Sequence, residues 1–436
     1  MKKILSLLLI IPMFALCEPN NQADNDGKDD PKEQEQTPPE EVDPAYAKAA
    51  PEVKNGDRVL ATNRNVEKFL TEVTYTDKDW SSTSIYNYYG GFNGVKYNAN
   101  GEPDENGELV KKPVSDKPES YSIRWVADNA AGAITVHLAD NTGWAQDIAV
   151  AAGKAYVDIT NLLPNAHYTY SVTGESGKEF TKGEFDTYGH LHQCFFKSDV
   201  RNCRDLGGWI TEDGKMVRYR RLYRTGRWDS ANLTKTGRAD IIAEGFGGQL
   251  DLRGTSDVLK ETTVNGLEFF APIFEQGGKT MLGVTNEVEA AKLKQSFEFT
   301  LGQIRKGKGV GFHCSLGRDR TGTLAILFLG LLGVPEHDIS KEYEVTYFAP
   351  MGYSVSSSEE AGWAEKHPDL PPFPYFINTR MNWVYSEVAP YFWQMAGAKG
   401  SFADGVEKYL LTVAKVSQED IDEFRSLMLV DAPAAN

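Results

Sequence analysis

Residues 310 to 322 read Val310-Gly311-Phe312-His313-Cys314-Ser315-Leu316-Gly317-Arg318-Asp319-Arg320-Thr321-Gly322, and this stretch decides the fold. A cysteine and an arginine lie six positions apart around a glycine. A short apolar run precedes them, and a longer one, 324–329, follows. Such runs on either side of a glycine-containing turn predict a buried strand, a loop and a buried helix. The stretch therefore predicts an α/β fold with a phosphate-binding loop at the C-terminal end of a strand.

The residue types in this loop suit the attack of a thiolate on a phosphate ester. Cys314 supplies the nucleophile, and the N terminus of the following helix stabilises both the thiolate and the anion. Arg320 can grip two phosphate oxygens with its planar guanidinium, which lysine cannot do. His313 is expected to support the loop through backbone hydrogen bonds rather than to act as a base. The expected phosphate-binding residues are Ser315, Leu316, Gly317, Arg318 and Thr321, and Thr321 is also expected to hydrogen-bond the sulfur.

The loop resembles the signature His-Cys-x-x-Gly-x-x-Arg-Thr-Gly of the cysteine-dependent phosphatase superfamily, and every fixed position matches. Further motifs precede it in the order found in secreted bacterial tyrosine and phosphoinositide phosphatases, so the resemblance covers roughly residues 195 to 430. These motifs are Asn202-Cys203-Arg204-Asp205-Leu206-Gly207-Gly208, Arg221-Leu222-Tyr223-Arg224-Thr225-Gly226 and Leu250-Asp251-Leu252-Arg253. The resemblance implies supporting roles for Asn202, Arg204, Asp205 and Arg253. The chain departs from the family pattern at Cys203, Thr225 and Arg318, which leaves substrate choice open.

Protonation of the leaving group requires a carboxylic acid near the ester oxygen. Many relatives carry this acid in a Trp-Pro-Asp loop, and no such tripeptide occurs in this chain. Asp319, inside the loop, resembles the acid position of phosphatases whose loop contains Asp-Arg, and it is the first candidate. Asp251, at the end of a predicted strand, is the second. The alternative for Asp251 is a structural carboxylate paired with a loop arginine.

The resemblance implies a phosphatase that hydrolyses phosphomonoesters through a cysteinyl-phosphate intermediate, without a metal or an organic cofactor. Protein phosphotyrosine is the first expected substrate, and a phosphoinositide or inositol phosphate is the alternative. A further alternative is a catalytically idle module for phosphate recognition or adhesion. His137 and His167 lie in separate predicted elements without metal-ligand spacing, so no metal site is expected.

Length and charge restrict the partners of the chain. The 436 residues carry a net charge of −16, with 41% hydrophobic and 25% charged residues. A chain of this length holds two or three domains, and its acidity argues against a nucleic-acid partner. Arginines nevertheless concentrate in and near the motifs, which is consistent with an anion site in an otherwise repelling surface. The alternative is that the arginines of the run 218–221 form a solvated turn.

The N terminus has the pattern of an exported protein. Two lysines and an apolar run precede Cys17, which predicts a signal peptide over residues 1–17 that is too short to span a membrane. Phe14-Ala15-Leu16-Cys17 resembles a bacterial lipobox, although Leu16 occupies a small-residue position. We expect lipidation at Cys17, a disordered acidic tether over 18–57, and a membrane-anchored lipoprotein that faces the periplasm or the cell surface.

Between the tether and the motifs, apolar and polar residues alternate with period two at 121–125 and 134–138. Leu163 to Val172 resembles the turn and penultimate strand of fibronectin type III modules, in which Tyr168 would pack as a corner. The expected architecture is an all-β immunoglobulin-like sandwich over 58–188, of unknown partner, followed by an α/β domain over 189–432 with a mostly parallel sheet flanked by helices. Cys194 and Cys203 could pair in an oxidising compartment, but free, partly buried thiols are favoured.

Overall fold

A computed structural model of the chain describes residues 44–72, 96–97, 108–109, 116–128, 132–198, 200–275, 283–349 and 383–432. Residues 45–436 form one compact unit. The predicted signal peptide, Cys17 and residues 18–43 of the predicted tether lie outside the described residues. Among the helices that are described, none has both the length and the apolar character that a membrane crossing requires.

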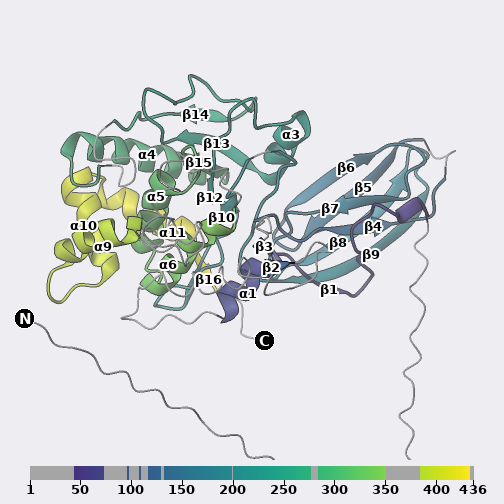
Figure 1. Cartoon of the computed structure of the whole chain (residues 1–436), viewed down its shortest axis with the longest axis horizontal. Coiled ribbons are helices and arrows are strands. Elements are labelled where there is room, and N and C mark those ends of the chain that lie inside the picture. Colours follow the sequence, from purple (N-terminus) through teal and green to yellow (C-terminus); the bar gives the residue numbers. More distant parts are fainter. Residues whose placement is uncertain are drawn as a thin grey trace, which may run out of the picture. The chain divides into compact units, whose positions relative to one another are not determined.

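The N-terminal β module contains two sheets that share one apolar core (Figure 1). The larger sheet has the strand order β1-β9-β8-β5-β6, and β4 pairs with β7 in the smaller one. Ile123 of β4 and Ile159 of β7 pack in the same cluster as Val136 and Phe185 of the larger sheet. The strands are β1 (Arg58–Leu60), β4 (Tyr121–Arg124), β5 (Ile134–Asp140), β6 (Ala145–Val150), β7 (Tyr156–Ile159), β8 (His167–Gly174) and β9 (Glu179–Tyr188).

Tyr168 makes the contact expected of a corner tyrosine, because its hydroxyl accepts a hydrogen bond from Leu163 N at 2.8 Å. The side chain is fully buried and stacks on Phe185, with ring centroids 5.2 Å apart. This contact fixes the turn before β8 to the core of the module.

Two segments differ from the predicted boundaries. Residues 44–57, assigned to the tether, pack on the β module: Val53 is buried in its core, and η1 (Pro44–Tyr46) precedes it. Helix α1 (Arg64–Glu72), assigned to the β module, instead packs against the core of the C-terminal module. Its Val66 and Phe69 are fully buried there, and the Phe69 ring lies 5.6 Å from that of Phe348. Neither segment has the period-two alternation of apolar and polar residues from which the β module was predicted, so the sequence did not mark where each segment packs.

The C-terminal module is built on a five-stranded sheet with the order β10-β12-β15-β13-β14. Strands β12, β15, β13 and β14 are parallel, and β10 is antiparallel to β12. This is the mostly parallel sheet that the sequence predicts. The strands are β10 (Arg204–Asp205), β12 (Leu222–Thr225), β13 (Phe246–Asp251), β14 (Glu268–Phe270) and β15 (Gly309–His313).

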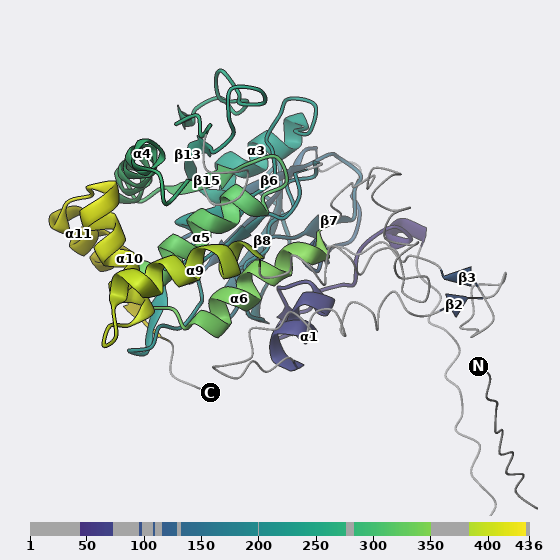
Figure 2. The same ribbon diagram turned by 60° about the vertical axis from the view of Figure 1, so that its left-hand side comes forward.

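Helices cover both faces of this sheet. Leu222, Leu250 and Phe312 pack with α4, α5, α6, α9, α10 and α11 on one face, whereas Tyr223 and Phe246 pack with α3 on the other. Figure 2 shows α5, α6 and α9 running alongside one another. The helices are α3 (Lys235–Glu244), α4 (Glu287–Arg305), α5 (Asp319–Leu331), α6 (Glu336–Glu344), η2 (Val345–Phe348), α9 (Trp383–Ala396), α10 (Phe402–Tyr409), η3 (Leu410–Ala414) and α11 (Gln418–Met428). Two small ribbons, β2 (Lys96–Tyr97) with β3 (Glu108–Leu109) and β11 (Lys215–Val217) with β16 (Leu429–Asp431), complete the described elements.

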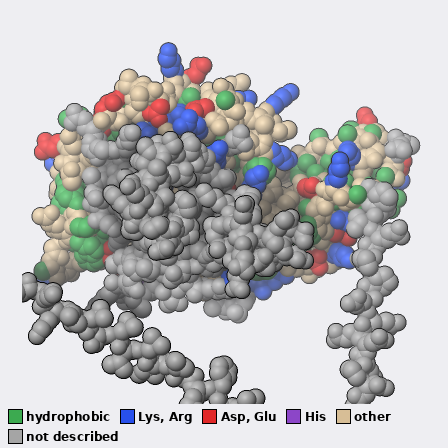
Figure 3. All heavy atoms as spheres, in the orientation of Figure 1, with side chains coloured by type: hydrophobic (Ala, Val, Ile, Leu, Met, Phe, Trp, Pro, Cys, Tyr) green, Lys and Arg blue, Asp and Glu red, His purple; other side chains and the backbone are tan. Residues whose placement is uncertain are grey.

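The surface carries charges of both signs. The face in Figure 3 shows Lys and Arg side chains interspersed with Asp and Glu, although the whole chain has a net charge of −16. An acidic chain can therefore still present local clusters of positive charge.

Candidate active site

The nucleophile loop connects β15 to α5, at the C-terminal end of a central parallel strand. Cys314 follows β15 directly and is 4% exposed. Gly317 has a φ of +69°, and a Cβ there would lie 2.5 Å from the backbone of Thr225. Only glycine fits this left-handed, crowded position, so the loop closes tightly against the end of β12.

A buried group of three charged side chains fixes the loop from behind. Arg204 Nε donates to Glu342 Oε1 at 2.7 Å, and Arg224 Nη1 donates to Glu342 Oε2 at 2.5 Å. Arg224 Nη2 and Asn202 Nδ2 each donate to the Gly317 carbonyl at 2.8 Å. Both guanidiniums are at most 1% exposed, and burial, together with the nearby Arg224, lowers the pKa of Arg204 to about 10. We call Arg204, Arg224 and Glu342 the arginine brace.

The remaining motif residue, Asp205, does not reach the loop. It is fully buried, and it accepts hydrogen bonds from the backbone N–H groups of Gly207, at 2.9 Å, and of Arg220. Asp205 therefore shapes the turn that follows β10.

Asn202, which donates to the loop, is itself held by Asp116, whose Oδ2 accepts from Asn202 N at 2.6 Å. Burial raises the pKa of Asp116 against the opposing hydrogen bond from Asn202.

His313 supports the loop as expected, through the backbone. Its Nδ1 lies 3.3 Å from the Cys314 carbonyl, and its Nε2 lies 3.0 Å from Gln249 Nε2. Because the Thr262 hydroxyl donates to Gln249 Oε1, the Gln249 amide donates to His313 Nε2, so the ring proton is assigned to Nδ1. The ring is fully buried, and burial lowers its pKa although Asp251 opposes this. The neutral imidazole thus fixes the peptide before the nucleophile.

Asp251 has the arrangement of a structural carboxylate. It is fully buried, and Arg253 Nε and Nη2 donate to it at 2.9 Å each, while Leu259 N donates at 2.9 Å. Burial alone would raise the pKa of Asp251, but the hydrogen bonds and the charge of Arg253 outweigh it, and the pKa lies below its ordinary value. A carboxylate that stays ionised and saturated with donors is a poor proton donor. Asp251 is therefore a structural carboxylate rather than the acid. Arg253, its partner, also donates from Nη2 to Asp229 Oδ1 at 2.9 Å.

Asp319 begins α5 and is held by the preceding residue. Arg318 Nε and Nη2 donate to the two Asp319 oxygens at 2.8 and 3.1 Å. The Asp319 side chain is 18% exposed, whereas that of Arg318 is 4% exposed. Asp319 is thus the more accessible of the two predicted acids, and the Arg318 guanidinium is directed at Asp319.

Asp257 is a functional candidate that sequence reasoning missed. Its Oδ2 accepts from Ser315 Oγ at 2.7 Å and lies 3.6 Å from Arg320 Nη2. The Asp257 side chain is 34% exposed and that of Arg320 is 16% exposed. Asp257 therefore orients the guanidinium that would grip the phosphate. The only signal in the sequence that could have found Asp257 is its position four residues after Arg253 of the Asp-Leu-Arg motif. In the structure a turn follows that motif and contains Asp257.

A sequence model described as the tyrosine phosphatase family matches residues 197–430. The chain belongs to the tyrosine phosphatase family. A protein of Cupriavidus necator named as a putative tyrosine-protein phosphatase is 30% identical over 165 residues, which cover 33% of this chain and 59% of that protein. The match thus spans about three-fifths of the length of the curated relative. The family segment contains the nucleophile loop and the arginine brace.

One expected sulfur contact of this tyrosine phosphatase family member is not formed. Thr321 Oγ1 is buried and has no hydrogen-bond partner among the described residues, so the predicted bond to the Cys314 sulfur is not formed. The three described cysteines, Cys194, Cys203 and Cys314, are free and buried. Cys194 and Cys203 are therefore unpaired thiols, as the sequence favoured, and no disulfide joins them. The buried Thr321 hydroxyl remains a donor for an incoming oxygen or thiolate.

One group of potential metal ligands lies in the described part of this family member, away from the loop. Ligand atoms of His192, Cys194 and Glu244 lie within 4.8 Å of one another. They already have partners: His192 Nε2 lies 3.1 Å from Asn161 O, and Glu244 Oε1 accepts from Tyr223 at 2.9 Å. Since these lone pairs and protons are committed to hydrogen bonds, we assign no metal to this group.

Proposed function

We propose that the protein hydrolyses phosphomonoesters, with protein phosphotyrosine as the first substrate class. The observation that carries the proposal is the placement of Cys314 and Arg320 at the two ends of a tight loop between a parallel strand and a helix N terminus. Backbone N–H groups of such a loop and the helix dipole favour a bound dianion and a thiolate together. Family membership over residues 197–430 supports this activity.

The proposed reaction has two steps. The Cys314 thiolate forms a bond to phosphorus as the ester P–O bond breaks, and a carboxylic acid gives its proton to the departing oxygen. Water then attacks the cysteinyl phosphate, its proton returns to the carboxylate, and the thiolate leaves with release of inorganic phosphate. Arg320 and the amides of residues 315–320 stabilise the equatorial oxygens in both steps. Atoms and electrons balance without any other reactant.

Asp319 is the proposed acid, because Asp251 is buried and saturated with donors. In the Asp319→Asn variant we expect kcat for phenyl phosphate, a poor leaving group, to fall about 10²- to 10³-fold. The rate with 2,4-dinitrophenyl phosphate should change little, because that leaving group departs without a proton. Steady-state kinetics on both esters test the assignment. An equal loss on both would assign Asp319 to structure and direct attention to Asp257.

The substrate class is tested by turnover of a panel with the reduced full chain. The panel contains a phosphotyrosine peptide, a phosphoserine peptide, phosphatidylinositol phosphates in vesicles, and inositol hexakisphosphate. We expect the phosphotyrosine peptide to have the highest kcat/KM, and iodoacetate to stop its turnover by alkylating Cys314, with inorganic phosphate protecting. Peptide mapping identifies the alkylated thiol. Faster turnover of the inositol lipids would favour the alternative substrate class.

A phosphoinositide or inositol phosphate remains the second candidate, since Asp-Arg loops resemble those of lipid phosphatases. Against it, the additional guanidinium of Arg318 is bound to Asp319 at 2.8 Å rather than directed at the loop opening. An idle recognition module is the third candidate, and it predicts phosphate binding with no turnover of any ester in the panel.

The proposal for the rest of the chain is an exported lipoprotein anchored through Cys17, with a fibronectin type III-like module before the enzyme. The corner contact of Tyr168 with Leu163 and the common core of the two sheets support the module assignment. The mass of the mature N-terminal peptide tests the anchor. A diacylated Cys17 is expected, and an unmodified peptide that begins elsewhere would contradict it.

A further inference from the structure

A cavity of about 390 Å³ lies at the edge of the sheet opposite the nucleophile loop. Its lining includes residues 218–221 just before β12, Gly245 just before β13, and Gly307 and Lys308 just before β15. Three parallel strands therefore begin at this cavity, whereas Cys314 follows the end of β15. Five residues of β15 separate the two places, which at about 3.3 Å per residue is about 16 Å. The cavity cannot be part of the proposed active site.

The lining of the cavity is strongly positive in an acidic chain. Arg218, Arg221 and Lys308 all line it, and none of them forms an ion pair with a described residue. Arg218 Nε donates to the Leu427 carbonyl at 2.7 Å, which holds the side chain in place without neutralising it. Burial, and then the charge of Arg218, lower the pKa of Arg221. Like charges gathered in one cavity repel one another, and a bound anion would relieve this repulsion.

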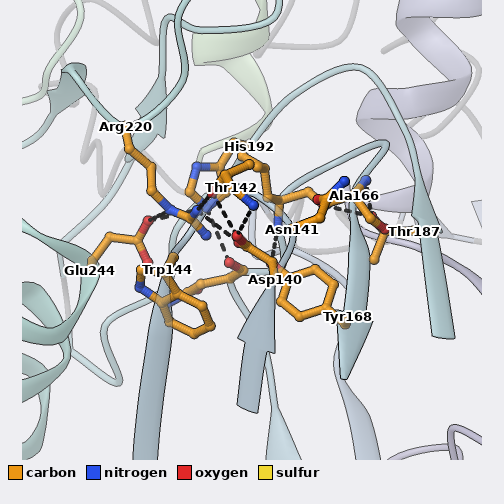
Figure 4. Close-up of polar contacts among 12 residues, drawn as sticks. Asp140, Asn141, Thr142, Trp144, Ala166, Tyr168, Thr187, His192, Arg220 and Glu244 are labelled. Atoms are coloured by element: carbon orange, nitrogen blue, oxygen red, sulfur yellow. Dashed lines mark hydrogen bonds and ion pairs between the residues drawn. The ribbon is translucent and has the colours of Figure 1, made fainter. Parts of the chain in front are cut away.

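The fourth cation, Arg220, offers a donor that has no partner. Arg220 is 8% exposed, and its Nη2 has no hydrogen-bond partner among the residues that the structure describes. Its other nitrogens are used: Nη1 lies 2.7 Å from Asp140 Oδ2 and donates to Thr142 Oγ1 at 2.8 Å, and Nε lies 3.2 Å from Glu244 Oε1 (Figure 4). A buried guanidinium nitrogen left without an acceptor costs free energy, and Arg220 adds its positive charge to the wall of the cavity.

The walls of the cavity are fixed by contacts between the two modules. Arg220 lies over the Trp144 ring at 4.9 Å from its centroid, and Trp144 Nε1 donates to the Ala243 carbonyl at 3.0 Å. Trp144 comes from the β5–β6 turn, and with Tyr219 it provides the aromatic part of the lining. The one carboxylate in the lining, Glu244, already accepts from Arg220 and Tyr223. The cavity is thus a preformed pocket with unpaired donors, within the size range of small-ligand sites.

We propose that this pocket binds a small polyanion that carries two or more phosphate or carboxylate groups. The guanidiniums of Arg218 and Arg221 and the Lys308 ammonium bind its charged groups, and Trp144 covers its remaining surface. Guanidinium groups match phosphate and carboxylate geometry bidentately, which favours these two anions over halides. The ligand sits at the junction of the two modules and is distinct from the ester hydrolysed at Cys314.

Calorimetry with the full chain in the Arg320→Ala background tests the proposal, because that substitution removes the phosphate grip of the active site. Inorganic pyrophosphate and citrate are the probes, and they separate a phosphate source from a carboxylate source. We expect saturable binding of at least one of them with one site per chain. The double variant Arg221→Gln/Lys308→Gln should weaken it about tenfold or more, as expected for lost charge-assisted hydrogen bonds. Lys306→Gln is the matched control, since Lys306 is exposed but pairs with Glu268 outside the pocket, and it should leave Kd within about twofold.

Absence of saturable heat with both probes up to about 10 mM, or an unchanged Kd in the double variant, would overturn the proposal. Lys308→Gln alone keeps the test valid if the double variant does not fold, because Lys308 is exposed. A second readout is thermal unfolding, in which a ligand that binds only the folded chain raises Tm with concentration. Raising the salt concentration should weaken the binding, since these charges are partly exposed to solvent.

Discussion

Replacing Cys314 with serine is expected to lower kcat for a phosphotyrosine peptide by about 10⁵-fold while peptide binding is retained. A serine hydroxyl is not ionised at neutral pH, so it cannot use the helix dipole and Arg320 as a thiolate does. The loop amides and Arg320 do not depend on the sulfur, so the phosphate site stays intact. Turnover assays, with calorimetry of the peptide on the variant, measure the two effects separately.

Cys194→Ser is the matched control for this substitution. Cys194 and Cys314 are both 4% exposed, but Cys194 packs beneath the opposite face of the sheet with Phe196 and Trp228. The control should keep turnover within about threefold, since it changes no group at the loop. Equal loss in both variants would mean that a serine in the core unfolds the chain. Substantial turnover in Cys314→Ser would contradict a cysteinyl-phosphate mechanism.

Replacing Glu342 with glutamine is expected to destabilise the fold by about 3–5 kcal/mol. Glu342 is 1% exposed and is the only acidic member of the arginine brace, so its loss leaves the buried Arg204 and Arg224 guanidiniums without the carboxylate that pairs with both of them. Urea denaturation followed by circular dichroism measures the change. Turnover at low temperature should fall as well, because Arg224 also holds the Gly317 carbonyl.

Glu336→Gln provides the control on the same helix, α6. Glu336 accepts from Trp393 Nε1 at 3.0 Å, and burial raises its pKa to about 7 against that bond. A carboxyl with a raised pKa contributes stability that is present at low pH and is lost as the pH rises toward 7. Glutamine should therefore remove this pH dependence and leave stability at pH 7.5 unchanged or slightly higher. A similar loss of unfolding free energy in both variants would show that the arginine brace contributes no more to stability than an ordinary buried carboxylate of α6.

The sequence predicted those features that depend on local pattern. The spacing of Cys314 and Arg320 placed a loop between a strand and a helix, and β15 and α5 flank it. Asn286 lies three positions before Glu289, and this spacing is typical of the start of a helix. Asn286 Oδ1 accepts from Val288 N at 2.9 Å at the start of α4. In each case the signal and the structure lie within a few residues of each other.

The features that were missed depend on contacts between distant residues. Glu342 and Arg204 are 138 residues apart, and no pattern near Glu342 marks it as the partner of two arginines. Asp257 reaches Ser315 across 58 residues, through a turn that no motif predicted. Asp251 was ambiguous because a strand-end carboxylate suits an acid as well as a salt bridge. Only burial and the donors around it separated the two roles.

Helix α1 has a consequence for how the chain is made. Its Val66 and Phe69 find their partners in the C-terminal module, and Phe69 contacts Phe348. At about 10 residues per second, roughly half a minute passes on the ribosome between synthesis of these two phenylalanines. During that interval Phe69 lacks its Phe348 contact, although β9, the last strand of the β module, is complete well before Phe348 is made. The apolar face of α1 in the nascent chain is therefore incompletely covered until most of the chain has been synthesised.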